Sequence, residues 1–182
     1  MTVEAKGMTF EIETLPGLFS PAHPDRGTMA MLGEADFREG MRVLDLGCGW
    51  GLVGLTAASV CGAENVWMCD IDPDAVRVAR ENAERNGLGG VHIVQSDGLA
   101  SVDEAGFDMI LTNPPYQTDF AVAKRFIEKG FNRLKIGGVM FVVVKREKWY
   151  LNKMRSVFGG ARSVLRDGYY VISAQRRSAA RG

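Results

Sequence analysis

The stretch Arg42-Val43-Leu44-Asp45-Leu46-Gly47-Cys48-Gly49-Trp50-Gly51 decides the fold of this chain. Its first five residues are mostly aliphatic, as in a short, buried strand of a parallel sheet. A glycine-rich turn follows, and residues from Leu52 to about Val60 are apolar enough to form a packed helix. A strand, a glycine-rich turn and a helix N-terminus let backbone amides approach a ligand closely. The stretch therefore predicts an α/β fold with a ligand site at the end of this strand.

Strands and helices are predicted to alternate along the rest of the chain. The pair Asp72-Pro73 suits an N-cap followed by a first helical residue, and Asp167-Gly168 suits the turn of a closing antiparallel hairpin. We expect one domain over residues 1–182, with an N-terminal extension over 1–40, a core over 41–175 and a frayed tail over 176–182. The predicted strands are 8–13, 42–46, 65–69, 91–95, 107–112, 139–144, 162–165 and 169–174, and the predicted helices are 28–32, 52–60, 73–86, 120–131 and 149–157.

The second strand of the predicted core ends in Asp70. An acidic residue at the end of this strand, about 20 residues after the glycine-rich turn, is placed to bind ribose hydroxyls. The pattern therefore indicates an adenosine-containing ligand. The run Gly49-Trp50-Gly51-Leu52-Val53-Gly54 fits the dinucleotide fingerprint G-x-G-x-x-G, which is weak evidence for NAD when it stands alone. The first glycine of the turn is Gly47, however, and a count that starts there reaches Leu52 where a glycine is required.

The four residues Asn113-Pro114-Pro115-Tyr116 say most about the chemistry. They follow the apolar run 107–112, which is typical of a buried strand. Two prolines fix two φ angles and remove two amide donors, and they push Asn113 out of the helical region. The result is a rigid edge with an amide side chain, a fixed carbonyl and an aromatic face. This edge suits a flat amino group, which needs acceptors for its two N–H bonds and a ring to stack on.

The chain resembles a known family through these motifs. Asp45-Leu46-Gly47-Cys48-Gly49-Trp50-Gly51 is similar to motif I of the class I S-adenosylmethionine-dependent methyltransferases, and Asn113-Pro114-Pro115-Tyr116 to the subset that methylates planar nitrogens. Gly17-Leu18-Phe19-Ser20 and Asp25-Arg26-Gly27-Thr28 resemble the opening of the ribosomal RNA small subunit methyltransferase C family, which makes N2-methylguanine. The resemblance runs from about Met8 to Ala174. It implies a Rossmann-like class I methyltransferase with a seven-stranded, mostly parallel sheet, helices on both faces and a C-terminal antiparallel hairpin.

The resemblance also implies roles for individual residues. Asn113, Pro114 and Tyr116 would be catalytic, and Pro115 and Tyr116 would bind the substrate; Lys145 and Arg146 are added as substrate-binding residues because of their charge and their place in the sheet. Asp97 would accept a hydrogen bond from the adenine amino group, and Asp45 would organise the turn near the methionine part of the cofactor. The implied cofactor is S-adenosylmethionine, with S-adenosylhomocysteine as product, and its expected contacts are Thr28, Asp45, Gly47, Cys48, Gly49, Asp70, Ile71, Asp97 and Asn113.

Two features depart from the ribosomal RNA enzymes. Tyr116-Gln117-Thr118-Asp119 stands where those enzymes carry a Phe-His-x-Gly type of segment. We also expect no counterpart of the degenerate N-terminal copy that the two-domain members carry. The Tyr116 version is equally similar to adenine-N6 and protein glutamine-N5 methyltransferases. These activities, a small-molecule methyltransferase and a cofactor-binding module without catalysis therefore stay open as alternatives to a guanine in ribosomal RNA.

Charge is unevenly distributed along a chain with no net charge. Residues 1–91 hold seven Lys/Arg and fourteen Asp/Glu, whereas residues 92–182 hold fifteen and eight. Lys145 and Arg146 follow the strand predicted at 139–144, so they fall at the carboxyl edge of the sheet, where basic side chains could hold RNA phosphates. No apolar run is long enough for a membrane span, and no apolar signal segment opens the chain. The three cysteines lack metal or disulfide spacing, so we expect a cytoplasmic protein without a bound metal.

Overall fold

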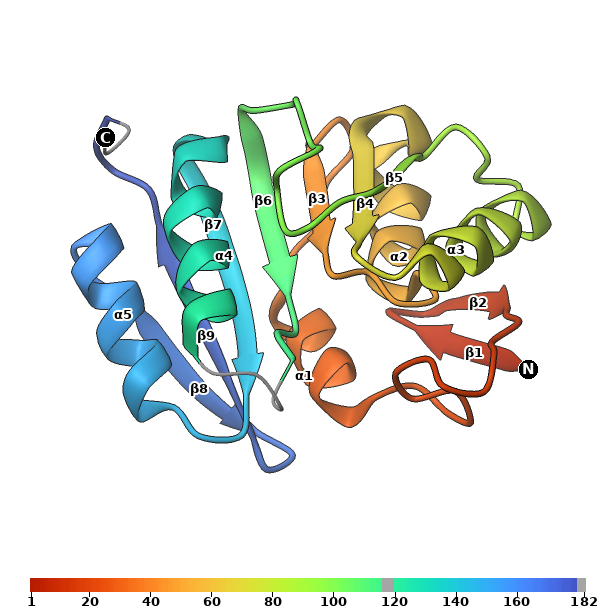
Figure 1. Ribbon diagram of the computed structural model, residues 1–182, viewed down its shortest axis with the longest axis horizontal. Coiled ribbons are helices and arrows are strands. Elements are labelled where there is room, and N and C mark those ends of the chain that lie inside the picture. Colours follow the sequence, from red (N-terminus) through yellow and green to blue (C-terminus); the bar gives the residue numbers. More distant parts are fainter. Residues whose placement is uncertain (116–119, 180–182) are drawn as a thin grey trace.

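The structure is a computed structural model that describes residues 1–115 and 120–179. Its main sheet has seven strands: β3 (Val43–Leu46), β4 (Val66–Asp70), β5 (His92–Gln95), β6 (Phe107–Thr112), β7 (Leu134–Val144), β8 (Arg162–Arg166) and β9 (Tyr169–Gln175). Their order across the sheet is β5-β4-β3-β6-β7-β9-β8 (Figure 1). The strands from β5 to β7 pair in parallel, and β9 runs antiparallel to β7 and β8. The predicted mostly parallel sheet with a closing hairpin is confirmed.

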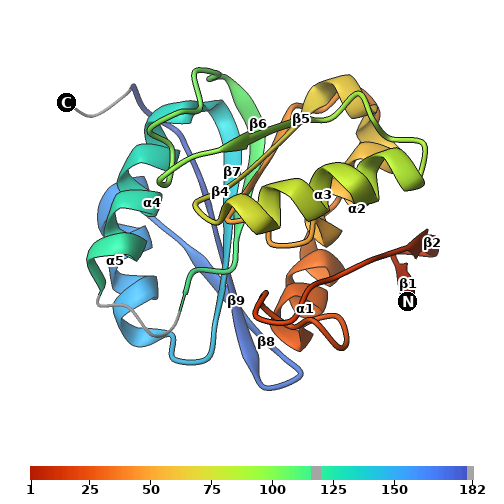
Figure 2. The same cartoon turned by 45° about the vertical axis from the view of Figure 1, so that its right-hand side comes forward.

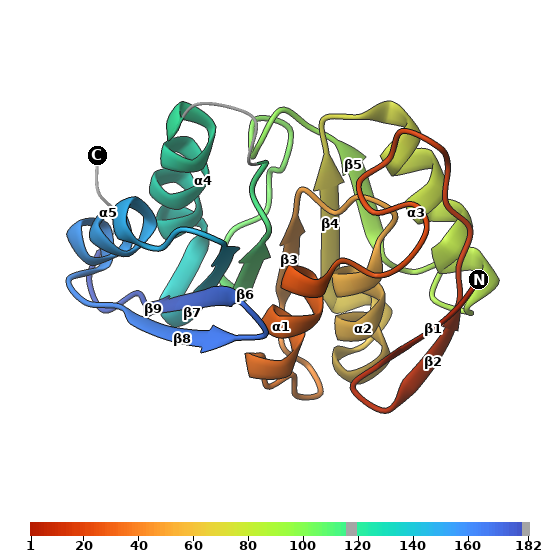
Figure 3. The same ribbon diagram turned by 90° about the horizontal axis from the view of Figure 1, so that it is seen from below.

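Helices cover both faces of this sheet, as predicted. On one face lie α1 (Arg26–Glu34), α2 (Leu52–Cys61) and α3 (Pro73–Arg85), and a short 3-10 turn, η1 (Ala63–Asn65), follows α2. On the other face lie α4 (Phe120–Arg133) and α5 (Lys148–Phe158) (Figures 2 and 3). Side chains alternate between the two faces along each strand, so adjacent residues of β3 enter different cores: Val43 packs with the first group of helices and Leu44 with the second.

The N-terminus forms a two-stranded hairpin, β1 (Thr2–Ala5) with β2 (Met8–Glu11), where the sequence predicted only one β segment over 8–13. The turn between the strands has positive φ at Lys6 and Gly7. Lysine is not a usual residue for such a turn, so the sequence signal was weak. The hairpin docks on the end of α3, where the Asn86 side chain exchanges hydrogen bonds of 2.9 and 2.8 Å with the backbone of Glu11.

Strand β7 begins five residues earlier than the predicted start at Val139. It includes Gly137 and Gly138, which lie before the predicted strand 139–144. Its pairing with β6 shifts register between Phe107 and Met109. The early part of β7 also pairs with Arg176, which was expected at the start of a frayed tail. Arg176 is instead buried, and its guanidinium donates to the carbonyl of Leu134. Among the described residues, no helix is both long enough and apolar enough to cross a lipid bilayer.

Candidate active site

A cavity of about 800 Å³ lies at the carboxyl ends of β3, β4, β5 and β6. The arrowheads of β3, β4, β6 and β7 point to this edge in Figure 1. Parallel pairing keeps the strand ends level, since Leu46 stands opposite both Cys69 and Thr112, and Asp70 stands opposite Gln95. The nine residues predicted to contact the cofactor all line the cavity: Thr28, Asp45, Gly47, Cys48, Gly49, Asp70, Ile71, Asp97 and Asn113.

The glycine-rich turn wraps the end of β3 before α2 begins. Gly47, Gly49 and Gly51 have φ values of 76°, 54° and 107°, a region that L side chains rarely adopt, so glycine is required there. The amides of Gly47 and Cys48 both donate to the carbonyl of Cys69, at 2.9 Å each. The turn is thus fixed to the neighbouring strand β4, with its backbone close to the cavity.

Asp70 stands at the end of β4 and holds two backbone segments. One carboxylate oxygen accepts from the amide of Gly49 at 2.9 Å, and the other accepts from the amide of Asp72 at 2.9 Å. A carboxylate has about four acceptor positions, so hydrogen bonds to ligand hydroxyls remain possible. Asp72 itself caps α3 by accepting from the amide of Asp74, as the sequence predicted.

Asp45 lies inside the cavity wall and is 3 % exposed. Burial raises the pKa of its carboxyl to about 7, the negative charge of Asp70 also raises it, and the amide of Gly54, which donates to Asp45 at 2.8 Å, lowers it. A Cβ atom on Gly54 would lie 2.2 Å from the Met68 sulfur. Gly54, the last glycine of the dinucleotide-like run, therefore serves the close packing of α2 on β4.

The thiols at the cavity are neutral. Burial raises the pKa of Cys48 well above its usual range, and burial raises the pKa of Cys69 to about 12. The negative charges of Asp45 and Asp70 act in the same direction on both. Because the thiolate is the reactive form of cysteine, neither side chain is prepared to act as a nucleophile.

Asp97 and Ile71 form the far end of the cavity, beyond β5 and β4. The Asp97 side chain is 60 % exposed and lies 3.8 Å from the guanidinium of Arg125. Exposed ion pairs of this kind contribute little to stability. Ile71 is 63 % exposed although it is a large apolar residue. An apolar wall beside a carboxylate can accept a planar ring that carries an amino group.

Asn113 follows β6 and is held by the start of α1. Its side-chain nitrogen donates to an Asp25 carboxylate oxygen at 2.9 Å and to the Thr28 hydroxyl at 3.2 Å. The same Asp25 oxygen accepts from the Thr28 amide at 2.8 Å and so caps α1. Sequence reasoning assigned no role to Asp25. The signal was present in the Asp25-Arg26-Gly27-Thr28 motif, but nothing in the sequence placed that motif beside Asn113.

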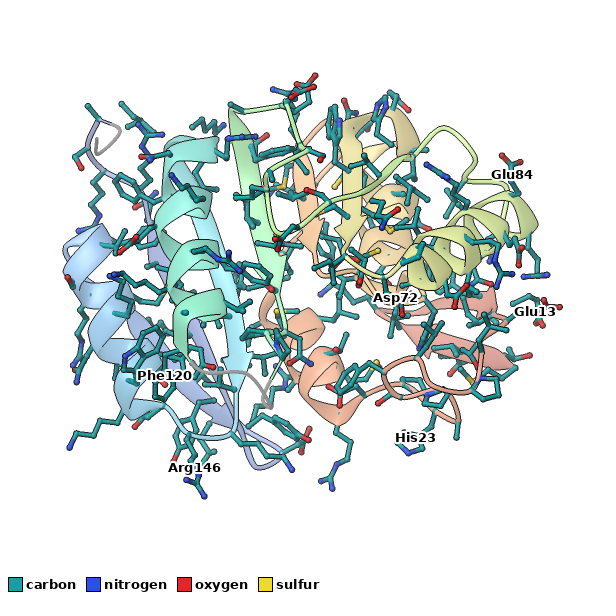
Figure 4. The ribbon with its side chains drawn as sticks, in the orientation of Figure 1. Glu13, His23, Asp72, Glu84, Phe120 and Arg146 are labelled. Atoms are coloured by element: carbon teal, nitrogen blue, oxygen red, sulfur yellow. The ribbon has the colours of Figure 1, made fainter. Side chains whose placement is uncertain are left out.

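The remaining predicted site residues are divided between the cavity and its surroundings. Pro114 is buried, Pro115 is exposed, and both line the cavity, whereas Tyr116 falls outside the described residues. Lys145 and Arg146 are exposed at the end of β7 and do not line the cavity (Figure 4, which labels Arg146). The structure thus separates these two side chains from the cofactor residues but leaves them on the same edge of the sheet.

Sequence reasoning also left the N-terminal loop without a site role. Residues 17–20 line the cavity, and the Phe19 side chain there is 51 % exposed. The Trp50 indole donates to the carbonyl of Ser20 at 3.3 Å, which ties this loop to the glycine-rich turn. Asn82, which lies in α3, donates from its side chain to the carbonyl of Trp50 at 2.9 Å. Among the described residues, no group of three or more His, Cys, Asp or Glu is placed to hold a metal ion.

The comparisons with known proteins agree with this geometry. The family model of the methyltransferase small domain matches residues 9–174. The chain belongs to the methyltransferase small domain family. The predicted enzyme class, an S-adenosylmethionine-dependent methyltransferase, is thereby confirmed, and the Rossmann-like fold class with it. The alternative of a dinucleotide-binding protein is not supported.

Individual known proteins are similar over most of the chain. The uncharacterized protein YbxB of Bacillus subtilis is 34 % identical over 94 % of this chain and 87 % of its own length. The ribosomal RNA small subunit methyltransferase C of Hahella chejuensis is 33 % identical over 90 % of this chain and 48 % of its own. A solved structure, the T. thermophilus 16S rRNA N2 G1207 methyltransferase in complex with AdoMet and guanosine, superposes with a TM-score of 0.88 at 28 % identity, covering 97 % of this chain and 50 % of that one. The chain thus spans about half the length of these ribosomal RNA enzymes.

Proposed function

We propose that this methyltransferase transfers a methyl group from S-adenosylmethionine to the exocyclic N2 amino group of a guanine in ribosomal RNA. The observation that carries the proposal is the amide of Asn113 at the end of β6, whose nitrogen donates to Asp25 and Thr28 at the start of α1, so its oxygen points away from those two groups. The similarity to enzymes named for ribosomal RNA methylation supports the choice of substrate. Such a substrate agrees with the cytoplasmic location expected from the sequence.

The cavity suits the cofactor in size and in chemistry. Asp70 offers carboxylate oxygens for two ribose hydroxyls, and Asp97 with Ile71 would receive the adenine ring. The turn at Gly47 and Gly49 would bring backbone close to the methionine part of the cofactor. The carboxyl of Asp45 stands behind this turn. When bound, S-adenosylmethionine supplies a methyl group activated on a positively charged sulfur.

The protein's part in the chemistry is to hold the amino group of the acceptor. Conjugation with its ring makes that nitrogen a poor nucleophile. The Asn113 side-chain oxygen and the Pro114 carbonyl would each accept one N–H, which favours a more tetrahedral nitrogen with its lone pair aimed at the methyl group. Tyr116 would stack on the base. Transfer would form the N–C bond as the S–C bond of the cofactor breaks, and the proton on nitrogen would become acidic and pass to solvent. Positioning and hydrogen bonding would therefore carry the catalysis without a strong general base.

An RNA substrate is favoured by the surface beside the cavity. Lys145, Arg146 and Lys148 are exposed where β7 ends and α5 begins. On the same side of the molecule, Phe120 is 51 % exposed and stacks on Trp149 with the ring centroids 4.4 Å apart (Figure 4, which labels Phe120 and Arg146). Basic side chains bind phosphates, and exposed aromatic rings stack on unpaired bases. A base in folded RNA would have to be unstacked to enter the cavity.

The test is to supply labelled S-adenosylmethionine together with total RNA, DNA or protein and to find which fraction takes up label. Label is expected in RNA, and incorporation should be far slower with Asn113→Ala, which removes one of the two acceptors for the amino group. Label in protein would favour glutamine-N5 methylation, and label in DNA would favour adenine-N6 methylation. Either result would contradict the proposed substrate while leaving the enzyme class intact.

A further inference from the structure

We infer that Asp25 is a positioning residue that sets which way the Asn113 amide faces and thereby prepares it for methyl transfer. The inference rests on the proposed function, in which the oxygen of that amide accepts a hydrogen bond from the amino group that is to be methylated. An amide has two ends of nearly equal size, a donor and an acceptor, and the two can exchange places by rotation. A site that needs the oxygen at one position must therefore prevent this rotation.

The contacts around Asn113 distinguish the nitrogen of its amide from the oxygen and so prevent this rotation. An ionised carboxylate only accepts hydrogen bonds, so Asp25 can pair with the amide nitrogen and not with the amide oxygen. The separation of 2.9 Å is that of a good hydrogen bond, and the carboxylate makes it a charge-assisted one. The second N–H of the amide faces the Thr28 hydroxyl at 3.2 Å. Rotating the amide would place its oxygen against the Asp25 oxygen, which is repulsive.

Asp25 can do this because it is itself held in place. The oxygen that faces Asn113 also accepts from the Thr28 amide at 2.8 Å, as the N-cap of α1. The helix is seated against β9 through Gly27, where a Cβ atom would lie 2.9 Å from the Tyr169 ring. One turn further along α1, on the same face of the helix, Met31 is 1 % exposed and packs in the core. The motif at residues 25–28 thus contains three parts: Asp25 caps α1, Gly27 lets α1 approach Tyr169 closely, and the Thr28 hydroxyl accepts a second hydrogen bond from the Asn113 amide.

The cap and the contact to Asn113 can be separated by substitution. Asp25→Ser keeps an N-cap hydroxyl for the Thr28 amide but is too short to reach Asn113 as well. Asp25→Asn keeps an acceptor oxygen that can serve both groups. We expect Asp25→Ser to lower kcat by roughly tenfold to a hundredfold, the scale of a misplaced catalytic group, with a small change in Tm. Asp25→Asn should recover much of that loss, and the cofactor Kd should barely change in either variant.

A double-mutant cycle tests whether Asp25 acts through Asn113. In the Asn113→Ala background, measured by slow incorporation of labelled methyl into RNA, Asp25→Ser should cause no further loss. Additive losses would overturn the inference, as would wild-type kcat in Asp25→Ser. A loss of activity that matches a loss of folded protein would also overturn it, because capping alone would then explain the effect.

A second measurement needs no substrate. The two side-chain N–H signals of Asn113, identified by their absence in Asn113→Ala, should be shifted and slow to exchange in the wild type and in Asp25→Asn. In Asp25→Ser they should move toward the values of solvent-exposed amides. If they do not change, the inference is wrong. If the wild type methylates no RNA, the proposed function fails, and the N–H signals still decide whether Asp25 orients Asn113.

Discussion

Two carboxylates, Asp45 and Asp70, lie in one cavity wall in different surroundings. Asp70 is partly exposed at a strand end and receives backbone amides on both oxygens, whereas Asp45 is buried with one amide donor from Gly54. The difference suits two tasks. An accessible carboxylate can bind hydroxyl groups, and a buried one can support the glycine-rich turn from behind.

The raised pKa of Asp45 makes stability depend on pH. Its pKa is about 7 in the folded protein, against an ordinary value of 3.8 in an unfolded chain. Between these values the folded state holds a proton that the unfolded state has released, so the free energy of unfolding falls as pH rises through this window. The total loss should be on the order of a few kcal/mol. Asp45→Asn removes this contribution.

Urea unfolding of the wild type and of Asp45→Asn, without cofactor, checks this at about pH 5 and about pH 7.5. The variant should gain stability relative to the wild type at the higher pH. Comparing the two proteins cancels the contribution of other groups, such as Asp108, whose pKa the Lys135 ammonium lowers against the opposing effect of burial. An equal difference at both pH values would contradict the assignment.

Cofactor binding and chemistry should respond to different residues. Asp70→Ala should weaken S-adenosylmethionine binding about tenfold or more, since charge-assisted hydrogen bonds contribute roughly 1.5–3 kcal/mol each. Part of the effect would come from the glycine-rich turn, which loses its bond to Gly49. Asn113→Ala should leave the cofactor Kd nearly unchanged and depress turnover. Calorimetry and single-turnover rates measure the two quantities, and loss of cofactor binding with turnover intact in Asn113→Ala would refute the proposed role.

Most residues that line the cavity could be predicted from the sequence, because they directly follow predicted strands. Residues that follow parallel strands meet at one edge, so Asp70, Asp97 and Asn113 could be placed together from the sequence. Asp25 could not, because its partner Asn113 lies 88 residues away and no periodicity links a helix cap to a strand end. Its position depends on how α1 packs.

Strand β7 shows what the sequence could not predict at the level of elements. Its early part contains Gly137 and Gly138, which usually interrupt strands, so the prediction began only with the aliphatic run at Val139. Tertiary contacts override that preference. A Cβ atom on Gly138 would lie 2.7 Å from the carbonyl oxygen of Phe107, so the glycine permits the close approach of β6 where the register shifts.

Gly138→Ala should therefore destabilise the protein by about 1–3 kcal/mol, as overpacking does in tight sites. The clash is with backbone atoms, which cannot move aside as a side chain could. Gly160→Ala is the matched control, because a Cβ atom there has no atom within 4 Å and should change stability little. Urea midpoints of the two variants give the comparison. Equal midpoints would show that β7 adjusts freely at this position.

Across the whole molecule, the basic C-terminal half supplies the edge of the sheet that faces the proposed RNA. Lys145 carries its ammonium 5.3 Å from the Tyr169 ring centroid, and Tyr169 in turn packs on α1. The basic edge is therefore joined to the element that holds Asn113. The chain order alone predicted this edge, but it did not predict that Lys145 and Arg146 would lie outside the cavity.

If the substrate is RNA, its binding should depend on salt through these side chains. Each phosphate contact releases counterions, so apparent substrate affinity should fall steeply between about 50 and 200 mM salt. Lys145→Ala with Arg146→Ala should flatten the logarithmic slope by about two units, while the cofactor Kd barely responds. The measurement is the apparent substrate constant across a salt series for both proteins. A flat response in both would favour a protein or small-molecule substrate.

The most direct test of the account is to identify the methylated nucleoside. Unmodified small-subunit ribosomal RNA is incubated with the protein and labelled S-adenosylmethionine, digested to nucleosides and separated by mass. Label is expected in N2-methylguanosine, with far less label in the same digest after an equal reaction time with Asn113→Ala. Label in N6-methyladenosine, or an unlabelled RNA digest beside a labelled protein fraction, would contradict the account.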